Sequence, residues 1–235
     1  TGLLGFILER TFLRPMVGEP VFSVAVLTIG IDILLRVVLD NWIGINPKYM
    51  GDPFPSYGNF GSLNIGGLTV KYLEVTALIT SLVLISILSV FFKRSKYGVA
   101  MRATSLDQEA ALAQGINVGR VFGLVWFIAG LLAAFAGFFI TGGFNTLTNT
   151  SFISALRALP AVVIGGLDSI TGAIIGSLII GLTQAYVGYY QFDIESAYNI
   201  KLGNGFSIVA PYLIMFVILL VKPHGLFGTE EVERV

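Results

Sequence analysis

The chain has 235 residues, of which 55% are hydrophobic and only 12% charged, and its mean hydropathy is +0.84. A soluble domain this apolar would aggregate, so the composition indicates an integral membrane protein. The formal net charge is zero, which leaves no electrostatic basis for binding nucleic acid. The chain contains no cysteine and one histidine, which excludes disulfides, cysteine nucleophiles and thiolate or histidine metal sites within it.

Several apolar runs are long enough to be transmembrane helices. Spanning a bilayer takes about 20 apolar residues as a helix, because every backbone polar group must be satisfied within the segment. The sequence therefore predicts an all-α, polytopic transmembrane helix bundle of about six spans, at residues 21–39, 73–92, 121–141, 152–167, 170–188 and 206–221. The run 152–167 is marginal in length and contains Arg157 and Pro160, so we expect a broken or partly re-entrant helix there. Residues 2–8 are too short to span, and we interpret them as the end of a preceding helix or an interfacial turn.

The segments between these runs predict a topology. Residues 41–69 are rich in glycine, proline, asparagine and aromatic side chains, which is typical of an irregular loop, and residues 189–205 are polar and aromatic. We place both outside the membrane, together with the short loop 142–151. Residues 93–120 are the one long polar interruption and have basic residues at both flanks. The positive-inside rule assigns this stretch to the cytoplasm.

A short helix is predicted within this polar stretch. Residues 107–114 are rich in alanine, leucine, glutamine and glutamate, which are strong helix formers, and Gly115 stands where such a helix would stop. Thr104 and Ser105 are candidate N-caps, with Asp107 in the first turn, where the helix dipole favours a negative charge.

The spacing of Glu109, Ala110, Ala111 and Gly115 is E-A-A-x-x-x-G, which resembles the cytoplasmic coupling loop of ABC importer permeases. Longer strings resemble the permeases of branched-chain amino acid importers. These are Arg102-Ala103-Thr104-Ser105-x-Asp107, Ala110-Ala111 and Gly115-Ile116-Asn117 in the loop, residues 164–173 (I-G-G-L-x-S-I-x-G-A) and 222–228 (K-P-x-G-L-F-G), and Glu9-Arg10 and Arg14-Pro15. The resemblance covers essentially the whole chain.

The resemblance implies one ABC-importer permease domain over residues 1–235, with 93–120 as its cytoplasmic coupling loop. Members of this family usually carry further hydrophobic helices ahead of the matched segment, so we expect this sequence to be truncated at its N-terminus. The resemblance also implies that a helix in the loop docks into a cleft on a separate ATP-hydrolysing subunit. The residues expected to couple are Arg102, Asp107, Glu109, Ala110, Ala111, Gly115 and Asn117.

The same resemblance implies the partners and the setting. We expect two ATP-binding subunits, a second homologous permease, a periplasmic amino-acid-binding protein and membrane lipid, in the inner membrane of a bacterial cell. The chain contains no GxxxxGK[ST] phosphate loop and no catalytic constellation, so we expect a non-enzymatic subunit. No cofactor is expected in this chain, because ATP would bind to the partner subunit.

Other interpretations stay open. The stretch 93–120 also fits an ordinary cytoplasmic loop helix between two spans. Within transport, relatives of this family carry urea, short amides or sugars. From another class, a passive channel or a secondary transporter would need no coupling helix and no ATPase partner, and a structural membrane anchor would not explain polar residues within the spans.

Ionisable residues inside a span are costly and mark a possible translocation pathway. Asp32 and Arg36 are four residues apart, so they share one helix face and can pair with each other, or they can gate substrate. Arg157 has no acidic neighbour at helical spacing, so two roles fit it: binding a substrate carboxylate, or snorkelling and capping carbonyls near Pro160. Asp168 is a candidate cap for the helix that follows it.

Glycines recur at helical spacing. Gly119, Gly123, Gly130 and Gly137 would lie on one smooth helix face. Small residues let membrane helices approach closely, since packing rather than the hydrophobic effect drives their association in lipid. The glycines expected at helix contacts are Gly123, Gly130, Gly165, Gly166, Gly172 and Gly176.

Overall fold

The computed structural model describes residues 1–17, 19, 21–49, 62–65, 68–144, 146–147, 153–156, 158–201, 203 and 205–228. It divides into two compact units, Thr1–Asn149 and Thr150–Val235. Helices dominate both units, which confirms the all-α fold class. The expectation of a single permease domain over residues 1–235 stays a prediction.

Among the described residues, four helices are long and apolar enough to cross a membrane. They are Phe22–Ile43, Tyr72–Arg94, Val118–Gly142 and Ile170–Tyr198, and the shorter apolar helix Phe206–Val221 follows them. These helices coincide with five of the six expected spans, and the full number of spans stays a prediction.

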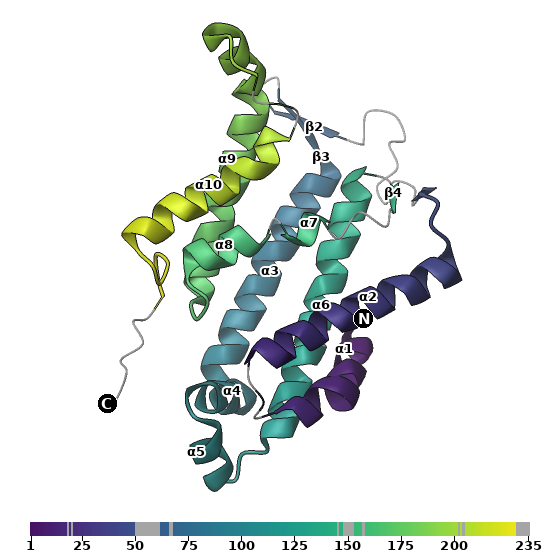
Figure 1. Cartoon of the computed structure of the whole chain (residues 1–235), viewed down its shortest axis with the longest axis vertical. Helices are drawn as coiled ribbons and strands as arrows, with labels where there is room; N and C mark the ends of the chain where they lie inside the picture. The colour runs from purple at the N-terminus through teal and green to yellow at the C-terminus, as the bar shows by residue number, and fades with distance from the viewer. Residues whose placement is uncertain are drawn as a thin grey trace. The chain divides into compact units, whose positions relative to one another are not determined.

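The first unit contains the polar stretch 93–120 and the two long helices that flank it (Figure 1). Its helices are α1 (Gly2–Leu8), the π-helical η1 (Glu9–Leu13), the 3-10 turn η2 (Arg14–Met16), α2 (Val21–Ile43), α3 (Tyr72–Arg94), α4 (Lys96–Leu106), α5 (Gln108–Ala113) and α6 (Val118–Phe144). Two small antiparallel pairs accompany them, β1 (Lys48–Tyr49) with β4 (Thr146–Leu147) and β2 (Ser62–Ile65) with β3 (Leu68–Lys71).

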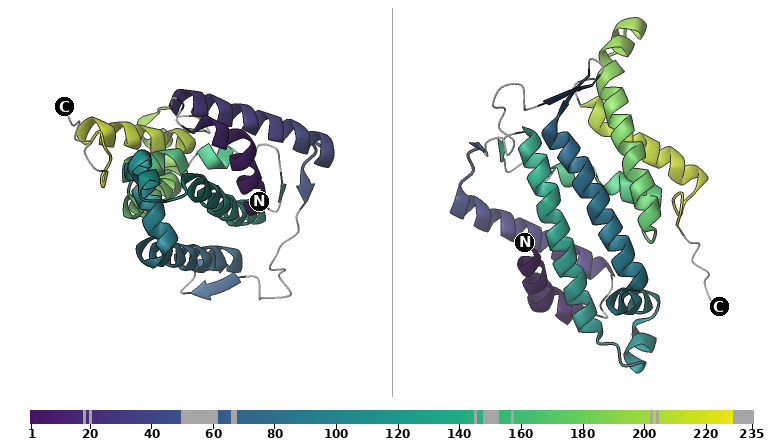
Figure 2. Two further views of the ribbon diagram at one scale, coloured as in Figure 1. Left: turned by 90° about the horizontal axis from the view of Figure 1, so that it is seen from below. Right: turned by 180° about the vertical axis from the view of Figure 1, so that it is seen from behind.

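Helix α1 packs directly on α6 (Figures 1 and 2). Glycines on both helices make this close contact possible, because a side chain would collide with the facing backbone. A Cβ on Gly5 would overlap the carbonyl oxygen of Trp126, and a Cβ on Gly130 would lie 2.8 Å from the carbonyl oxygen of Thr1. The segment 2–8 is therefore a packed helix that continues into η1, rather than an interfacial turn.

The second unit is built around a tight pair of helices. Its elements are α7 (Ile153–Leu156), α8 (Ala158–Gly165), α9 (Ile170–Tyr198) and α10 (Phe206–Val221). The buried side chains of Ala161, Ile164 and Ile180 form the core between α8 and α9. The described helical residues between 153 and 165 would extend about 20 Å, compared with the roughly 30 Å hydrocarbon core of a bilayer. Whether the predicted span 152–167 crosses the membrane stays a prediction.

The prediction of a loop over residues 189–205 is wrong for its first half, because α9 continues to Tyr198. The segment 189–198 contains no glycine or proline that would stop a helix, so backbone hydrogen bonding continues past the apolar run. Asn199 ends the helix in the left-handed conformation, with φ of 51°. The buried amide of Gln191 then donates 2.6 Å to the carbonyl of Gly203 and braces the following loop.

The segment after α10 completes the end of α8. The backbone N–H groups of Leu226 and Phe227 donate to the carbonyls of Ile164 and Gly165, at 2.7 and 3.1 Å. The last carbonyls of a helix have no partner within the helix, so another segment must supply donors. Gly225 adopts φ of +81° where it meets the turn after α8, a conformation that favours glycine.

Candidate functional site

The loop between α3 and α6 contains two helices, whereas the sequence predicted one. The first, α4, is capped by Ser95, whose hydroxyl accepts from the N–H groups of Tyr97 and Gly98 at 3.0 and 3.3 Å. Gly98 lets α4 fold back on the end of α3, because a Cβ there would lie 2.6 Å from the carbonyl oxygen of Phe92. The loop therefore starts from a packed corner rather than from a free linker.

Arg102 reinforces this corner. Its guanidinium donates to the carbonyl oxygen of Phe92, in the last turn of α3. The final carbonyls of α3 lack helical partners, and a cation there also complements the helix dipole. In the structure Arg102 thus joins α4 to α3, and its role in coupling stays a prediction.

The predicted N-caps of the second helix are wrong. Asp107 caps α5, with its Oδ1 accepting from the N–H of Ala110 at 3.0 Å. Thr104 and Ser105 lie inside α4, where their hydroxyls donate to carbonyls one turn earlier at 2.9 Å. The reason is that α4 extends to Leu106, so the first residue with extended backbone is Asp107.

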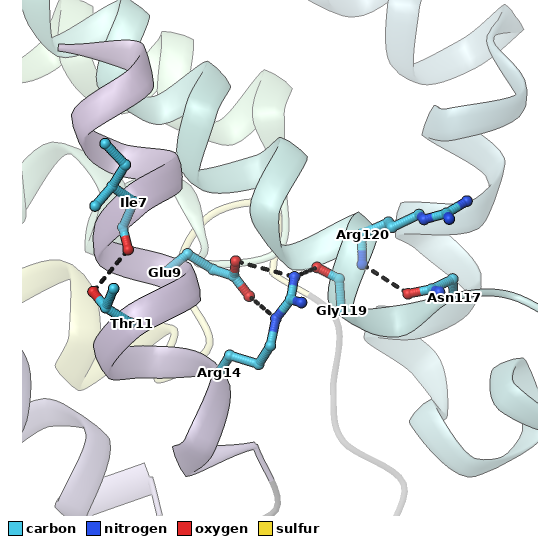
Figure 3. A network of polar contacts seen from close by, with 7 residues as sticks. All are labelled: Ile7, Glu9, Thr11, Arg14, Asn117, Gly119 and Arg120. Atoms are coloured by element: carbon cyan, nitrogen blue, oxygen red, sulfur yellow. Dashed lines mark hydrogen bonds and ion pairs between the residues drawn. The ribbon is translucent and has the colours of Figure 1, made fainter.

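The end of α5 agrees with the prediction for Gly115. This glycine has φ of +82°, and its N–H donates to Leu112 while the N–H of Ile116 donates to Ala111. These two bonds form a Schellman motif, the usual exit of a helix through a left-handed glycine. Two residues later the Oδ1 of Asn117 accepts from the N–H of Arg120 at 3.0 Å and caps the start of α6 (Figure 3).

The residues that the loop exposes are not the same as the residues predicted to couple to the ATPase. Glu109 and Ala110 are exposed, but Ala111 is only 4% exposed and belongs to the interior. Sequence reasoning missed two large apolar side chains, Leu106 and Leu112, which are 88% and 57% exposed. Leucines at positions within the polar stretch 93–120 are the signal that could have found them.

A second feature missed by sequence reasoning joins the N-terminal segment to α6 (Figure 3). The Nε of Arg14 lies 3.3 Å from Oε1 of Glu9, and its Nη2 lies 3.4 Å from Oε2. The same Nη2 donates 2.9 Å to the carbonyl oxygen of Gly119. Glu9 is 1% exposed, so this ion pair is buried on its acidic side.

Of the three charged residues expected within spans, the structure describes Asp32 and Arg36. Asp32 and Arg36 pair on α2, with Arg36 Nη2 2.7 Å from Asp32 Oδ2, as their spacing predicts. Their role in a pathway stays a prediction, and Arg157 lies outside the described residues. Asp168 is not the cap of α9, because Ser169 accepts from the N–H of Gly172 at 3.0 Å. Among the described residues, no group of three or more histidine, cysteine or acidic side chains could hold a metal ion.

The glycines expected at helix contacts all lie against other backbone or side-chain atoms. Gly123 and Gly130 of α6 face α1, and a Cβ on Gly123 would lie 2.8 Å from the ring of Phe6. In the second unit Gly165, Gly172 and Gly176 bring α8 and α9 together, while Gly166 meets Gly228 of the C-terminal segment. No described atom lies within 4 Å of a Cβ on Gly137, so that glycine does not belong to the α1 contact.

These features define a polytopic α-helical membrane protein with an ordered polar loop between two long apolar helices. Residues 1–221 match the family described as "Branched-chain amino acid transport system / permease component", and the chain belongs to this family.

Known relatives agree with this assignment. The chain is 26% identical over 236 residues to the high-affinity branched-chain amino acid transport system permease protein BraD of Pseudomonas aeruginosa, covering 100% of this chain and 73% of that protein. It is 30% identical to the permease protein LivH of the same kind of system in Salmonella typhimurium, covering 98% and 72%. A galactose/methyl galactoside import permease, MglC of Haemophilus influenzae, is 30% identical over 58% of this chain and 44% of its own length. No solved structure gives a significant match.

Proposed function

We propose that this chain is the permease subunit of an ATP-driven importer that moves branched-chain or related amino acids across the cytoplasmic membrane of a bacterial cell. The observation that carries the proposal is the α4–α5 loop, which is capped at each helix end and exposes Leu106, Glu109, Ala110 and Leu112. A rigid, partly apolar surface suits docking onto another protein.

The mechanism we propose is alternating access driven by ATP hydrolysis on separate subunits. Two ATP-binding subunits would bind and hydrolyse ATP, so this chain itself would need no cofactor. Their closure would displace α5, and the caps at Asp107, Gly115 and Asn117 would pass the displacement to the adjoining helices because each cap fixes a helix end. A second homologous permease would complete the pathway, and a periplasmic binding protein would deliver substrate on the opposite side.

Branched-chain amino acids are the substrate class that we favour. The relatives named for them match nearly the whole chain, whereas the galactoside permease matches 58% of it. That partial likeness keeps sugars as the second candidate class. A passive channel or a secondary transporter would work without an ATPase partner, and this difference gives the test.

The test is a pull-down of the tagged full-length protein in mild detergent, from cells that express the whole transport system, with mass spectrometry of the captured proteins. We expect an ATPase with a phosphate loop and a second permease, and we expect Glu109→Lys to lose the ATPase. The control is Asp193→Lys, which reverses an exposed charge far along the chain, on α9. Recovery of the chain without any ATPase, across several detergents, would contradict the proposal.

A further inference from the structure

A partly buried polar contact joins the N-terminal segment to the first turn of α6. Arg14 contacts Glu9 within its own segment and the carbonyl of Gly119 across 105 residues of sequence. One guanidinium thus holds an acid and a backbone oxygen together. Arginine suits this arrangement because its planar fork presents several donors in fixed directions.

The pairing depends on the π-helical turn η1. In an α-helix, side chains five residues apart point about 140° away from each other. The π turn widens the helix by one residue, so the N–H of Arg14 donates to the carbonyl of Glu9 and the two side chains come to one face. Single π turns inside α-helices are frequent at functional sites. The same turn also brings the buried Glu9 against α6.

The carboxylate of Glu9 is buried against α6, whereas the side chain of Arg14 is 38% exposed. Gly123 leaves space for the carboxylate, since a Cβ there would lie 3.2 Å from Glu9 Oε2. Removing the guanidinium would leave the buried carboxylate of Glu9 without its counter-charge, which is unfavourable. The pair therefore resists separation and holds η1 and η2 on α6.

The position of this contact relates it to the loop. Gly119 lies two residues after Asn117, the residue that caps α6 at the exit of the loop. Gln108, the first residue of α5, lines the same cavity of about 250 Å³ as Glu9 and Phe122. The loop and the Glu9–Arg14 pair thus meet at one end of α6.

We propose that Glu9 and Arg14 are positioning residues that make the α1–η2 segment move with α6 when the loop is displaced. This inference rests on the proposed function, because it assigns a path for the displacement that the ATPase would produce. The pair would do no chemistry and would not touch substrate. Its effect would be on the number of substrate molecules moved for each ATP hydrolysed.

The experiment measures uptake and ATP hydrolysis separately, with the complete transporter in proteoliposomes. We expect Arg14→Met to keep ATP hydrolysis while uptake per ATP falls by about fivefold or more, the lower end of typical coupling between sites. Arg14→Lys keeps the charge beside Glu9 but lacks the fork, so we expect an intermediate loss. Arg10→Met, which removes an exposed cation from the same segment, should leave the ratio unchanged.

A cross-link separates a positioning role from a merely structural one. The chain has no cysteine, so a cysteine pair introduced by Gly2→Cys and Leu131→Cys reacts alone in it. These positions face each other between α1 and α6, since a Cβ on Gly2 would lie 2.9 Å from the Cγ of Leu131. If the two helices move together, cross-linking should leave uptake per ATP unchanged in the otherwise wild-type chain and restore it in Arg14→Met. Each variant before cross-linking serves as its own reference.

Two outcomes would overturn the inference, and a third would overturn the proposed function instead. A normal ratio in Arg14→Met, or in Arg14→Lys if Arg14→Met does not fold, would overturn it. A cross-link that blocks uptake in the otherwise wild-type chain would also overturn it, because the helices would then have to move apart. Absence of ATP-dependent uptake in the wild-type transporter would instead overturn the proposed function.

Discussion

The backbones of Gly165 in α8 and Gly172 in α9 touch each other, so that a Cβ built on either residue would overlap the other's carbonyl. This contact fixes how the two helices of the second unit pack, together with the approach of Gly176 to the carbonyl of Ala161. Backbone contact of this kind is how membrane helices gain packing energy without a hydrophobic driving force between them.

Gly172→Ala should therefore destabilise the protein. In an exposed helix interior, alanine is favoured over glycine by about 1 kcal/mol. Here the added methyl group would force the helices apart, and overpacking costs about 1–3 kcal/mol. Thermal unfolding of the purified protein in detergent should show a lower midpoint. Gly181→Ala on the same helix is the matched control, because no described atom lies within 4 Å of its Cβ position. An unchanged midpoint for Gly172→Ala would contradict the packing described.

Gly115 should tolerate asparagine but not alanine or leucine. Its φ of +82° is left-handed, which costs an ordinary residue about 1–2 kcal/mol, whereas asparagine visits this region more readily. Gly115→Ala and Gly115→Leu should lower uptake per ATP while the long helices stay folded, and Gly115→Asn should retain most of it. Equal uptake by all three variants would show that the exit of α5 has no part in coupling.

Gly225 should behave differently from Gly115, although both have positive φ. A Cβ on Gly225 would lie 2.7 Å from the carbonyl oxygen of Val163 and 2.7 Å from the nitrogen of Gly166. Asparagine relieves the backbone strain but not this collision, so Gly225→Asn and Gly225→Ala should both lower the midpoint of thermal unfolding. If Gly225→Asn matched the wild type, the C-terminal segment would not be docked on the end of α8 as described.

Leu112→Ala should weaken capture of the ATPase. The side chain is 57% exposed on α5, so burying the rest of it in an interface contributes roughly half of the about 1.5–3 kcal/mol that burying a fully exposed leucine contributes. We expect a lower yield of ATPase in the pull-down with unchanged stability of the permease. Leu182→Ala on α9 removes an equally exposed side chain, also 57%, and should leave the yield unchanged. Equal yields for both variants would place the docking surface elsewhere.

Local patterns predicted much of the fold and part of the site. The long apolar runs identified the helices that can cross a membrane, since length and composition alone set that property. The spacing of Asp32 and Arg36 predicted their pairing, and Gly115 marked the end of α5. The ion pair and the helix end depend on residues within about one turn of each other, and each apolar run is one continuous segment, so the sequence alone contains the information for all three.

Other features were decided only by tertiary packing. Asp107, and not Thr104 or Ser105, caps α5 because α4 extends to Leu106. Helix α4 folds on the end of α3 through Gly98, and residues near position 107 give no sign of that contact. The Glu9–Arg14–Gly119 contact joins residues more than 100 positions apart, and residues 226–227 complete the end of α8. Burial and the need to satisfy backbone groups at helix ends select these partners, and both act only once the helices are placed against each other.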